Sequence, residues 1–155
     1  MTHIRPLPWL LAVFLILPLA VVSNVAHACK PEVFTGRGDV ALRGYDTVAY
    51  FEQGDAVKGD KAFTAKYKDA VWYFASEANK ALFEADPEAY APQYGGYCAW
   101  AMAMGDVVKS SPKAWHIHNS KLYLNVSKGI QKKWLANRDT FIEQADANWP
   151  AALNQ

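Results

Sequence analysis

The segment AWHIHNSKLYLNV, residues 114–126, constrains the fold more than any other stretch of this chain. Apolar and polar side chains alternate on both sides of Asn119 and Ser120, which predicts a tight β-hairpin with its turn at these two residues. The register of that hairpin places His116 opposite Tyr123 and His118 opposite Lys121. The opposite face carries four apolar side chains, Trp115, Ile117, Leu122 and Leu124. We therefore expect that apolar face to cover the core and the histidine face to meet solvent.

Other turn and capping signals extend this pattern along the chain. KAFTAKYKDAVWYFAS predicts a second hairpin that turns at Lys68 and Asp69, because its arms are rich in aromatic and β-branched residues. VALRGYDTVAYF, residues 40–51, predicts two strands separated by a break at Gly44. We find no internal repeat and no linker after residue 40.

Helices are predicted where a capping residue precedes a run of helix formers. The predicted N-caps are Ser76, Asp86 (followed by Pro87) and Ser127. YCAWAMAM predicts a short buried helix that stops at Gly105, with a buried strand as the alternative. The last segment predicts an amphipathic helix, or two helices that meet near Asn137. Small antiparallel hairpins packed with several helices define an α+β fold.

The first 28 residues have the features of a secretory signal peptide. A short segment with one basic residue, Arg5, precedes an apolar run and the small residues Ala26 and Ala28. Cleavage after Ala28 leaves Cys29 first, and lipidation of Cys29 is an alternative outcome of export. Residues 29–39 then form an extended arm, and residues 40–150 a single domain.

Charge and cysteine content narrow the classes of function. Arg5 is the only one of the 16 basic residues that precedes Cys29, and 15 acidic residues follow it, so the exported part has a net charge near zero. This balance predicts no binding to nucleic acid. Two cysteines in an exported chain suggest a disulfide between Cys29 and Cys98, unless Cys29 is lipidated.

Three quoted segments carry a family resemblance. GYDTVAYF, YFASEANKALFEADPEAYAPQYGGYCAWA and KLYLN, ahead of a closing NWP, resemble the exported bacterial branch of the YHS-domain proteins. The resemblance implies a small α+β module that binds a metal, with copper as the leading candidate. It also implies that three cysteines of metal-binding relatives are replaced here, by Ala49, Ala75 and Asn79. An alanine has no donor atom and an amide is a poor ligand for soft metals, so the thiolate site of the relatives is expected to be lost.

A different donor set remains in the exported part. Cys98, Met102, His116 and His118 supply thiolate, thioether and imidazole groups, which suit copper. Cys98 and Met102 share one face of a helix, and the two histidines share one face of a strand. Each has a structural alternative: Met102 as a core residue, Cys98 as a disulfide partner or buried thiol, and both histidines as solvent-facing residues. Tyr45 and Asp46 form another candidate pair, in which Asp46 binds backbone amides at a turn or acts as a ligand.

The sequence thus predicts an exported, periplasmic binding module without catalysis, which binds copper or a small ligand. The chain has no nucleophile elbow, phosphate-binding glycine loop or zinc-protease histidine pair. One alternative is a scaffold that docks an envelope protein partner through exposed aromatic residues. A second alternative is a thiol redox protein that uses Cys98. Contact with the membrane is expected only if Cys29 is lipidated.

Overall fold

The computed structural model describes residues 29–155, so the predicted signal peptide lies outside the described residues. Six α-helices and four strands are described in this part of the chain. The strands are β1 (Asp60–Tyr67), β2 (Ala70–Phe74), β3 (Ser111–His118) and β4 (Lys121–Asn125). The helices are α1 (Ala49–Glu52), α2 (Glu77–Ala85), α3 (Pro87–Tyr90), α4 (Ala99–Ala103), α5 (Lys128–Ala136) and α6 (Arg138–Asn148). The predicted α+β class is confirmed. Within residues 29–155, no helix is long and apolar enough to cross a membrane.

The strands form two antiparallel hairpins, as predicted. β1 pairs with β2 and β3 pairs with β4, and the turns fall at Lys68–Asp69 and Asn119–Ser120. All four turn residues have positive φ, which two-residue turns of this kind need to follow the strand twist. The predicted register is confirmed, with His116 opposite Tyr123 and His118 opposite Lys121.

The capping predictions are confirmed as well. The hydroxyls of Ser76 and Ser127 accept hydrogen bonds from backbone N–H groups at the starts of α2 and α5. The Asp86 carboxylate does the same for α3. The final helical segment is broken at Asn137 into α5 and α6. The short helix α4 ends just before Gly105, whose φ of 84° favours glycine.

The prediction of two strands in residues 40–51 is wrong. This segment makes only isolated bridges and then forms α1. The Asp46 carboxylate accepts hydrogen bonds from the N–H groups of Val48 and Ala49, at 2.8 and 3.2 Å, and so starts a helical turn. Because Val48, Ala49 and Tyr50 are all buried, the segment also lacks the alternating exposure of an edge strand.

The structure contradicts the statement that the chain has no internal repeat. Each half contains a bridge, a short helix, a bulged hairpin and a serine-capped helix, in the same order. Tyr45 bridges Lys58 in the first copy, and Tyr97 bridges Lys109 in the second. The sequence signal is short: GDAVK at residues 54–58 returns as GDVVK at residues 105–109. Most other positions differ between the two halves, so little in the sequence indicates the repeated order of elements.

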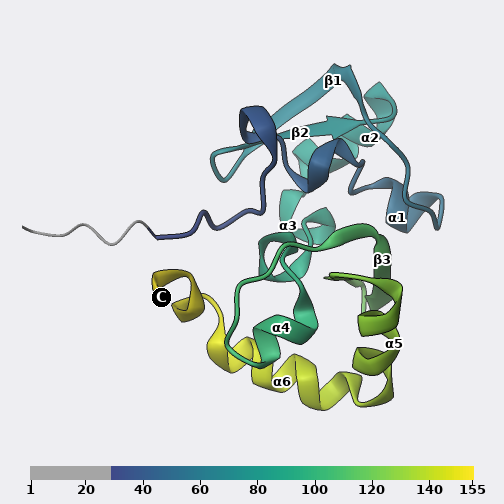
Figure 1. Ribbon diagram of the computed structural model, residues 1–155. Coiled ribbons are helices and arrows are strands. Elements are labelled where there is room, and N and C mark those ends of the chain that lie inside the picture. The colour runs from purple at the N-terminus through teal and green to yellow at the C-terminus, as the bar shows by residue number, and fades with distance from the viewer. Residues whose placement is uncertain (1–28) are drawn as a thin grey trace, which may run out of the picture.

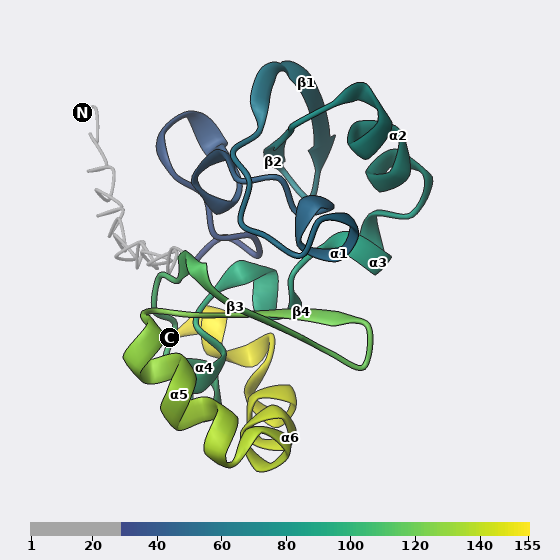
Figure 2. The same ribbon diagram turned by 90° about the vertical axis from the view of Figure 1, so that its right-hand side faces the viewer.

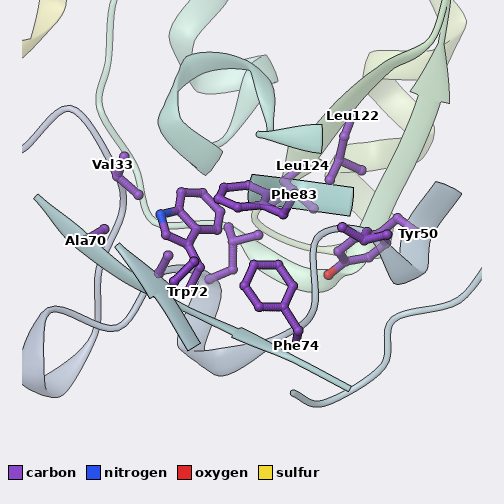
Figure 3. Packing of buried hydrophobic residues seen from close by; sticks show 12 residues of the cluster. Val33, Tyr50, Ala70, Trp72, Phe74, Phe83, Leu122 and Leu124 are labelled. Carbon is purple, nitrogen blue, oxygen red and sulfur yellow. The ribbon is translucent and has the colours of Figure 1, made fainter. Parts of the chain in front are cut away.

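The two copies form two lobes (Figures 1 and 2). One lobe holds β1, β2, α1 and α2, the other holds β3, β4, α4, α5 and α6, and α3 lies between them. The core of the first lobe includes Trp72, Phe74 and Phe83, and it also takes in Leu122 and Leu124 from β4. Figure 3 shows these two leucines reaching the aromatic cluster from the second copy. The second copy therefore contributes two side chains to the core of the first lobe, in addition to the separate core of its own.

The N-terminal arm ties both lobes together. The N–H of Phe34 donates to Gly95 O at 2.8 Å, and Phe34 O accepts the N–H of Leu42 at 3.2 Å. Val33 and Phe34 are buried, and Phe34 packs on Tyr97. The arm is therefore part of the fold and forms one side of the surface features described below.

Candidate functional site

The two cysteines lie in different environments and both thiols are free. Cys29 is exposed, with its Sγ 3.0 Å from Asn154 Oδ1. Cys98 is fully buried just before α4, where its Sγ accepts a hydrogen bond from the N–H of Val126 at 3.3 Å. Its Sγ also lies 3.7 Å from Asn125 Oδ1. The structure thus surrounds Cys98 with polar backbone and amide groups, and does not bond it to Cys29.

The other members of the predicted donor set are distributed around the second copy. Met102 is fully buried in the second core, and its N–H donates to Cys98 O at 2.9 Å, so the two residues share a helical turn as predicted. His116 packs edge-on against Trp134, and His118 Nε2 lies 3.4 Å from an Asp139 oxygen. Among residues 29–155, no three His, Cys, Asp or Glu side chains are grouped as metal ligands.

The expectation that the histidine face meets solvent is wrong. Tyr123, on the same face as His116, is 3% exposed, and both His116 and His118 are half-buried. The reason is that α5 and α6 pack on this face, so the hairpin is covered on both sides (Figure 2). Burial lowers the pKa of His116, and the positive charge of Arg138 lowers it further.

Asp46 is the centre of a buried hydrogen-bond network in the first copy. In addition to the N–H groups of Val48 and Ala49, its carboxylate accepts the N–H of Ala75 at 2.8 Å and Nδ2 of Asn79 at 2.6 Å. The predicted structural role of Asp46 is therefore the observed one. Tyr45, its neighbour, lies under Lys58, whose Nζ is 4.4 Å from the ring centre.

This network occupies the place of the expected thiolate site. Metal-binding relatives are expected to have cysteines at three positions, which are Ala49, Ala75 and Asn79 here. The backbone N–H groups of the two alanines and the side-chain amide of Asn79 all donate to the Asp46 carboxylate. These positions thus converge in space, as metal ligands must. Here the Asp46 carboxylate accepts all of these hydrogen bonds, which stabilises the fold.

Cys98 is the counterpart of Asp46 in the second copy. The N–H of Asp46 donates to Val57 O, and the N–H of Cys98 donates to Val108 O, both at 2.9 Å. Ala75 N–H donates to Asp46, and at the matching point Val126 N–H donates to Cys98. The same junction therefore holds a carboxylate in one copy and a thiol in the other.

The sequence analysis missed a cavity in the described part of the chain. It has a volume of about 650 Å³ and lies between the N-terminal arm, the start of β1 and the loop before β3. We call it the basic cleft, because five cationic side chains line it: Arg37, Arg43, Lys58, Lys61 and Lys109. The remaining side chains of its wall are Phe34, Thr35, Val40 and Tyr73.

The charges of the basic cleft are uncompensated within residues 29–155. No carboxylate lines it, and none of the five cations forms an ion pair with a described residue. The Nζ of Lys58 donates to Arg43 O at 2.6 Å, and the Arg43 guanidinium lies 5.7 Å from the Phe34 ring centre. The five residues are spread from position 37 to 109 in a chain of nearly balanced charge, so no local sequence pattern indicates the cluster.

With this geometry in place, comparison with known proteins relates one segment of the chain to a family. The family model of the YHS domain matches residues 48–94, and the predicted resemblance is confirmed over this segment. The match spans the first copy from α1 to the segment after α3. No curated protein and no solved structure matches the chain.

Proposed function

We propose that this protein is a non-catalytic binding module whose ligand site is the basic cleft. The observation that carries the proposal is a cavity of about 650 Å³ with a wall of cations and apolar side chains. This volume lies in the usual range for small-molecule sites, about 300–1,000 Å³. The cationic side chains that line it attract negatively charged groups, and the apolar side chains can pack against apolar parts of a ligand. The YHS segment supports the broader class of a small binding module.

The test is a small-ligand screen observed by two-dimensional NMR of the purified protein. We expect hits to shift the amide signals of residues that line the cleft, such as Thr35, Gly44 and Gly59. Thr35→Trp places a large ring in the cavity and should abolish binding. Thr140→Trp, on the exposed surface of α6, is the matched control and should bind normally. Hits that cluster elsewhere, or that bind Thr35→Trp unchanged, would refute the cleft as the site.

Copper binding is a second candidate, supported by one specific arrangement. Cys98 and Met102 present two buried sulfur atoms within one helical turn, and Cu(I) prefers sulfur ligands. The test is a Cu(I) titration against a competing chelator. Cys98→Ser and Met102→Leu should each weaken binding, whereas Met104→Leu, at an exposed neighbour, should not. Equal affinity of all four proteins would refute this site.

The proposed location is the periplasm, which rests on the signal-like residues before Cys29. Fractionation of cells, followed by mass measurement of the exported protein, tests it. A mass that begins at unmodified Cys29 supports a free periplasmic protein, and an added diacylglyceryl group supports a membrane-anchored lipoprotein. Retention of residues 1–28 in the cytoplasmic fraction would contradict export. The envelope-partner and thiol redox alternatives remain proposals without a specific contact in their favour.

A further inference from the structure

We infer that the ligand of the basic cleft is a small organic anion with at least two negatively charged groups on a planar apolar body. The inference rests on the proposed function, because it takes the cleft to be the ligand site. It adds the chemical class of the ligand, which follows from three features of the cleft wall: the origin of its charges, the use of its backbone amides and its apolar surface.

The five cations come from separate walls. Arg37 and Arg43 belong to the arm and the turn after it, Lys58 and Lys61 to the start of β1, and Lys109 to the second copy. One point charge cannot contact three walls of a 650 Å³ cavity, whereas two or more anionic groups on one molecule can. Since no described residue pairs with these cations, an anionic ligand would meet them without displacing a carboxylate.

The backbone N–H groups of the cleft glycines already donate hydrogen bonds within the protein. The N–H groups of Gly36, Gly44 and Gly59 donate to Val40 O, Ala41 O and Gly44 O, at 2.8, 2.8 and 2.9 Å. The cleft therefore lacks the free amides of a phosphate-binding glycine loop. Recognition of an anion in the cleft therefore depends on side chains. The long, flexible side chains of lysine and arginine suit several separated negative charges better than one tightly enclosed phosphate.

The apolar wall indicates the body of the ligand. Tyr73 and Val40 line the cleft and are partly exposed, whereas Phe34, which also lines it, is buried. The Tyr73 ring lies close to Gly44, where an added Cβ would be 3.1 Å from a ring carbon. An aromatic ring in a wall that also carries the guanidinium groups of Arg37 and Arg43 favours a planar ligand through stacking and cation–π contacts.

The duplication contributes to this site directly. Lys58 and Lys109 occupy matching positions in the two copies, each bridged to the tyrosine that follows a positive-φ glycine. Both lysines reach the same cleft. A ligand held by both would connect the copies and the arm, so its binding should also raise the melting temperature of the protein.

Three probes of matched chemistry test the inference by calorimetry. Naphthalene trisulfonate has the ring and three permanent charges, naphthalene monosulfonate has the ring and one charge, and inorganic tripolyphosphate has charge without a ring. We expect the trisulfonate to bind at least about tenfold more tightly than either of the others, since each well-formed charge contact contributes on the order of 1 kcal/mol. Its affinity should fall with added salt.

Variants assign the effect to the cleft. Lys61→Gln and Lys109→Gln are exposed substitutions that should each weaken trisulfonate binding by about fivefold, with little effect on the monosulfonate. Tyr73→Leu should reduce the preference of the protein for the trisulfonate over tripolyphosphate. Lys132→Gln, an exposed lysine on α5, is the control and should leave all three affinities unchanged.

The outcomes separate this inference from the proposed function. Equal binding of the two sulfonates, unaffected by Lys109→Gln but lost in Thr35→Trp, would overturn the anion inference and leave the cleft as a ligand site. Absence of binding by all three probes, and of any hit in the small-ligand NMR screen, would overturn both. Tighter binding of a single-stranded DNA oligonucleotide, dependent on the same lysines, would overturn the assignment to a small molecule.

Discussion

The two copies of the repeated unit solve the same structural problem with different chemistry. Each copy must anchor the turn before a short helix to the junction between a hairpin and a longer helix. The first copy uses the Asp46 carboxylate, which accepts four N–H groups. The second uses Cys98, whose sulfur accepts the Val126 N–H, together with Asn125, whose Oδ1 accepts the Trp100 N–H at 3.2 Å.

This difference shows how one position can change its chemistry while its geometry is retained. A thiol is a weaker acceptor than a carboxylate, so it cannot replace all of the contacts that Asp46 makes. Asn125, which replaces the buried Phe74 of the first copy, supplies the missing acceptor. Its Nδ2 is buried and has no partner among the described residues, which indicates an imperfect replacement. The first copy should therefore depend more on its anchor than the second.

The largest expected effect is the loss of the Asp46 carboxylate. Asp46→Ala leaves four N–H donors without an acceptor in a fully buried place, and we expect it to reduce the free energy of unfolding by about 3–5 kcal/mol. Cys98→Ala should cost only about 1–2 kcal/mol. Urea denaturation measures both, with the exposed Asp106→Ala as control. A larger loss for Cys98→Ala than for Asp46→Ala would reverse the proposed order of the two anchors.

A second prediction concerns the aromatic residue that seals each core. Phe83 on α2 and Trp134 on α5 occupy matching positions, at 1% and 0% exposed. Each substitution to Ala should cost about 3–5 kcal/mol, because it opens a large cavity. Since β4 contributes Leu122 and Leu124 to the first core and Tyr123 to the second, both variants should still unfold in one transition by fluorescence and circular dichroism. Separate transitions for the two lobes would show that they are independent domains.

The sequence predicted local structure better than the arrangement of the lobes. Both hairpin turns, their register and the serine caps depend on nearby residues, so pattern and capping rules located them. The α1 helix was missed because its start depends on Asp46, whose carboxylate also accepts Ala75 N–H from a distant segment. The basic cleft was missed for a similar reason: Arg37 and Lys109 meet only after the whole chain has folded.

The third prediction tests whether Asn125 compensates for the thiol. Cys98→Asp and Asn125→Phe together restore in the second copy the residue pair found in the first. Cys98→Asp alone should destabilise the protein, because the new carboxylate faces the side-chain carbonyl oxygen of Asn125. Asn125→Phe alone should also destabilise it, because the substitution removes the acceptor for the Trp100 N–H. The double variant should be more stable than the sum of the single effects predicts, by about 1–3 kcal/mol. Additive effects in this double-mutant cycle would refute the compensation.

The smallest expected effect is a pH dependence confined to the second copy. His116 stands where the first copy has Ala65, and it lies against the edge of Trp134 near Arg138 and His118. Because its pKa is lowered in the folded protein, the unfolded chain binds the proton more readily, and stability falls as the pH drops below about 6.5, the ordinary histidine value. At pH 7 and above this loss is absent.

His116→Gln removes the titrating group while keeping a polar side chain. We expect the free energy of unfolding of this variant to change less between pH 7 and pH 5 than that of the parent, with similar values at pH 8. His118→Gln is the comparison variant, since His118 lies on the same strand and faces Asp139 at 3.4 Å, whereas His116 packs against Trp134. If the free energy of unfolding of His116→Gln changes with pH as much as that of the parent, groups common to both copies set the pH dependence of stability.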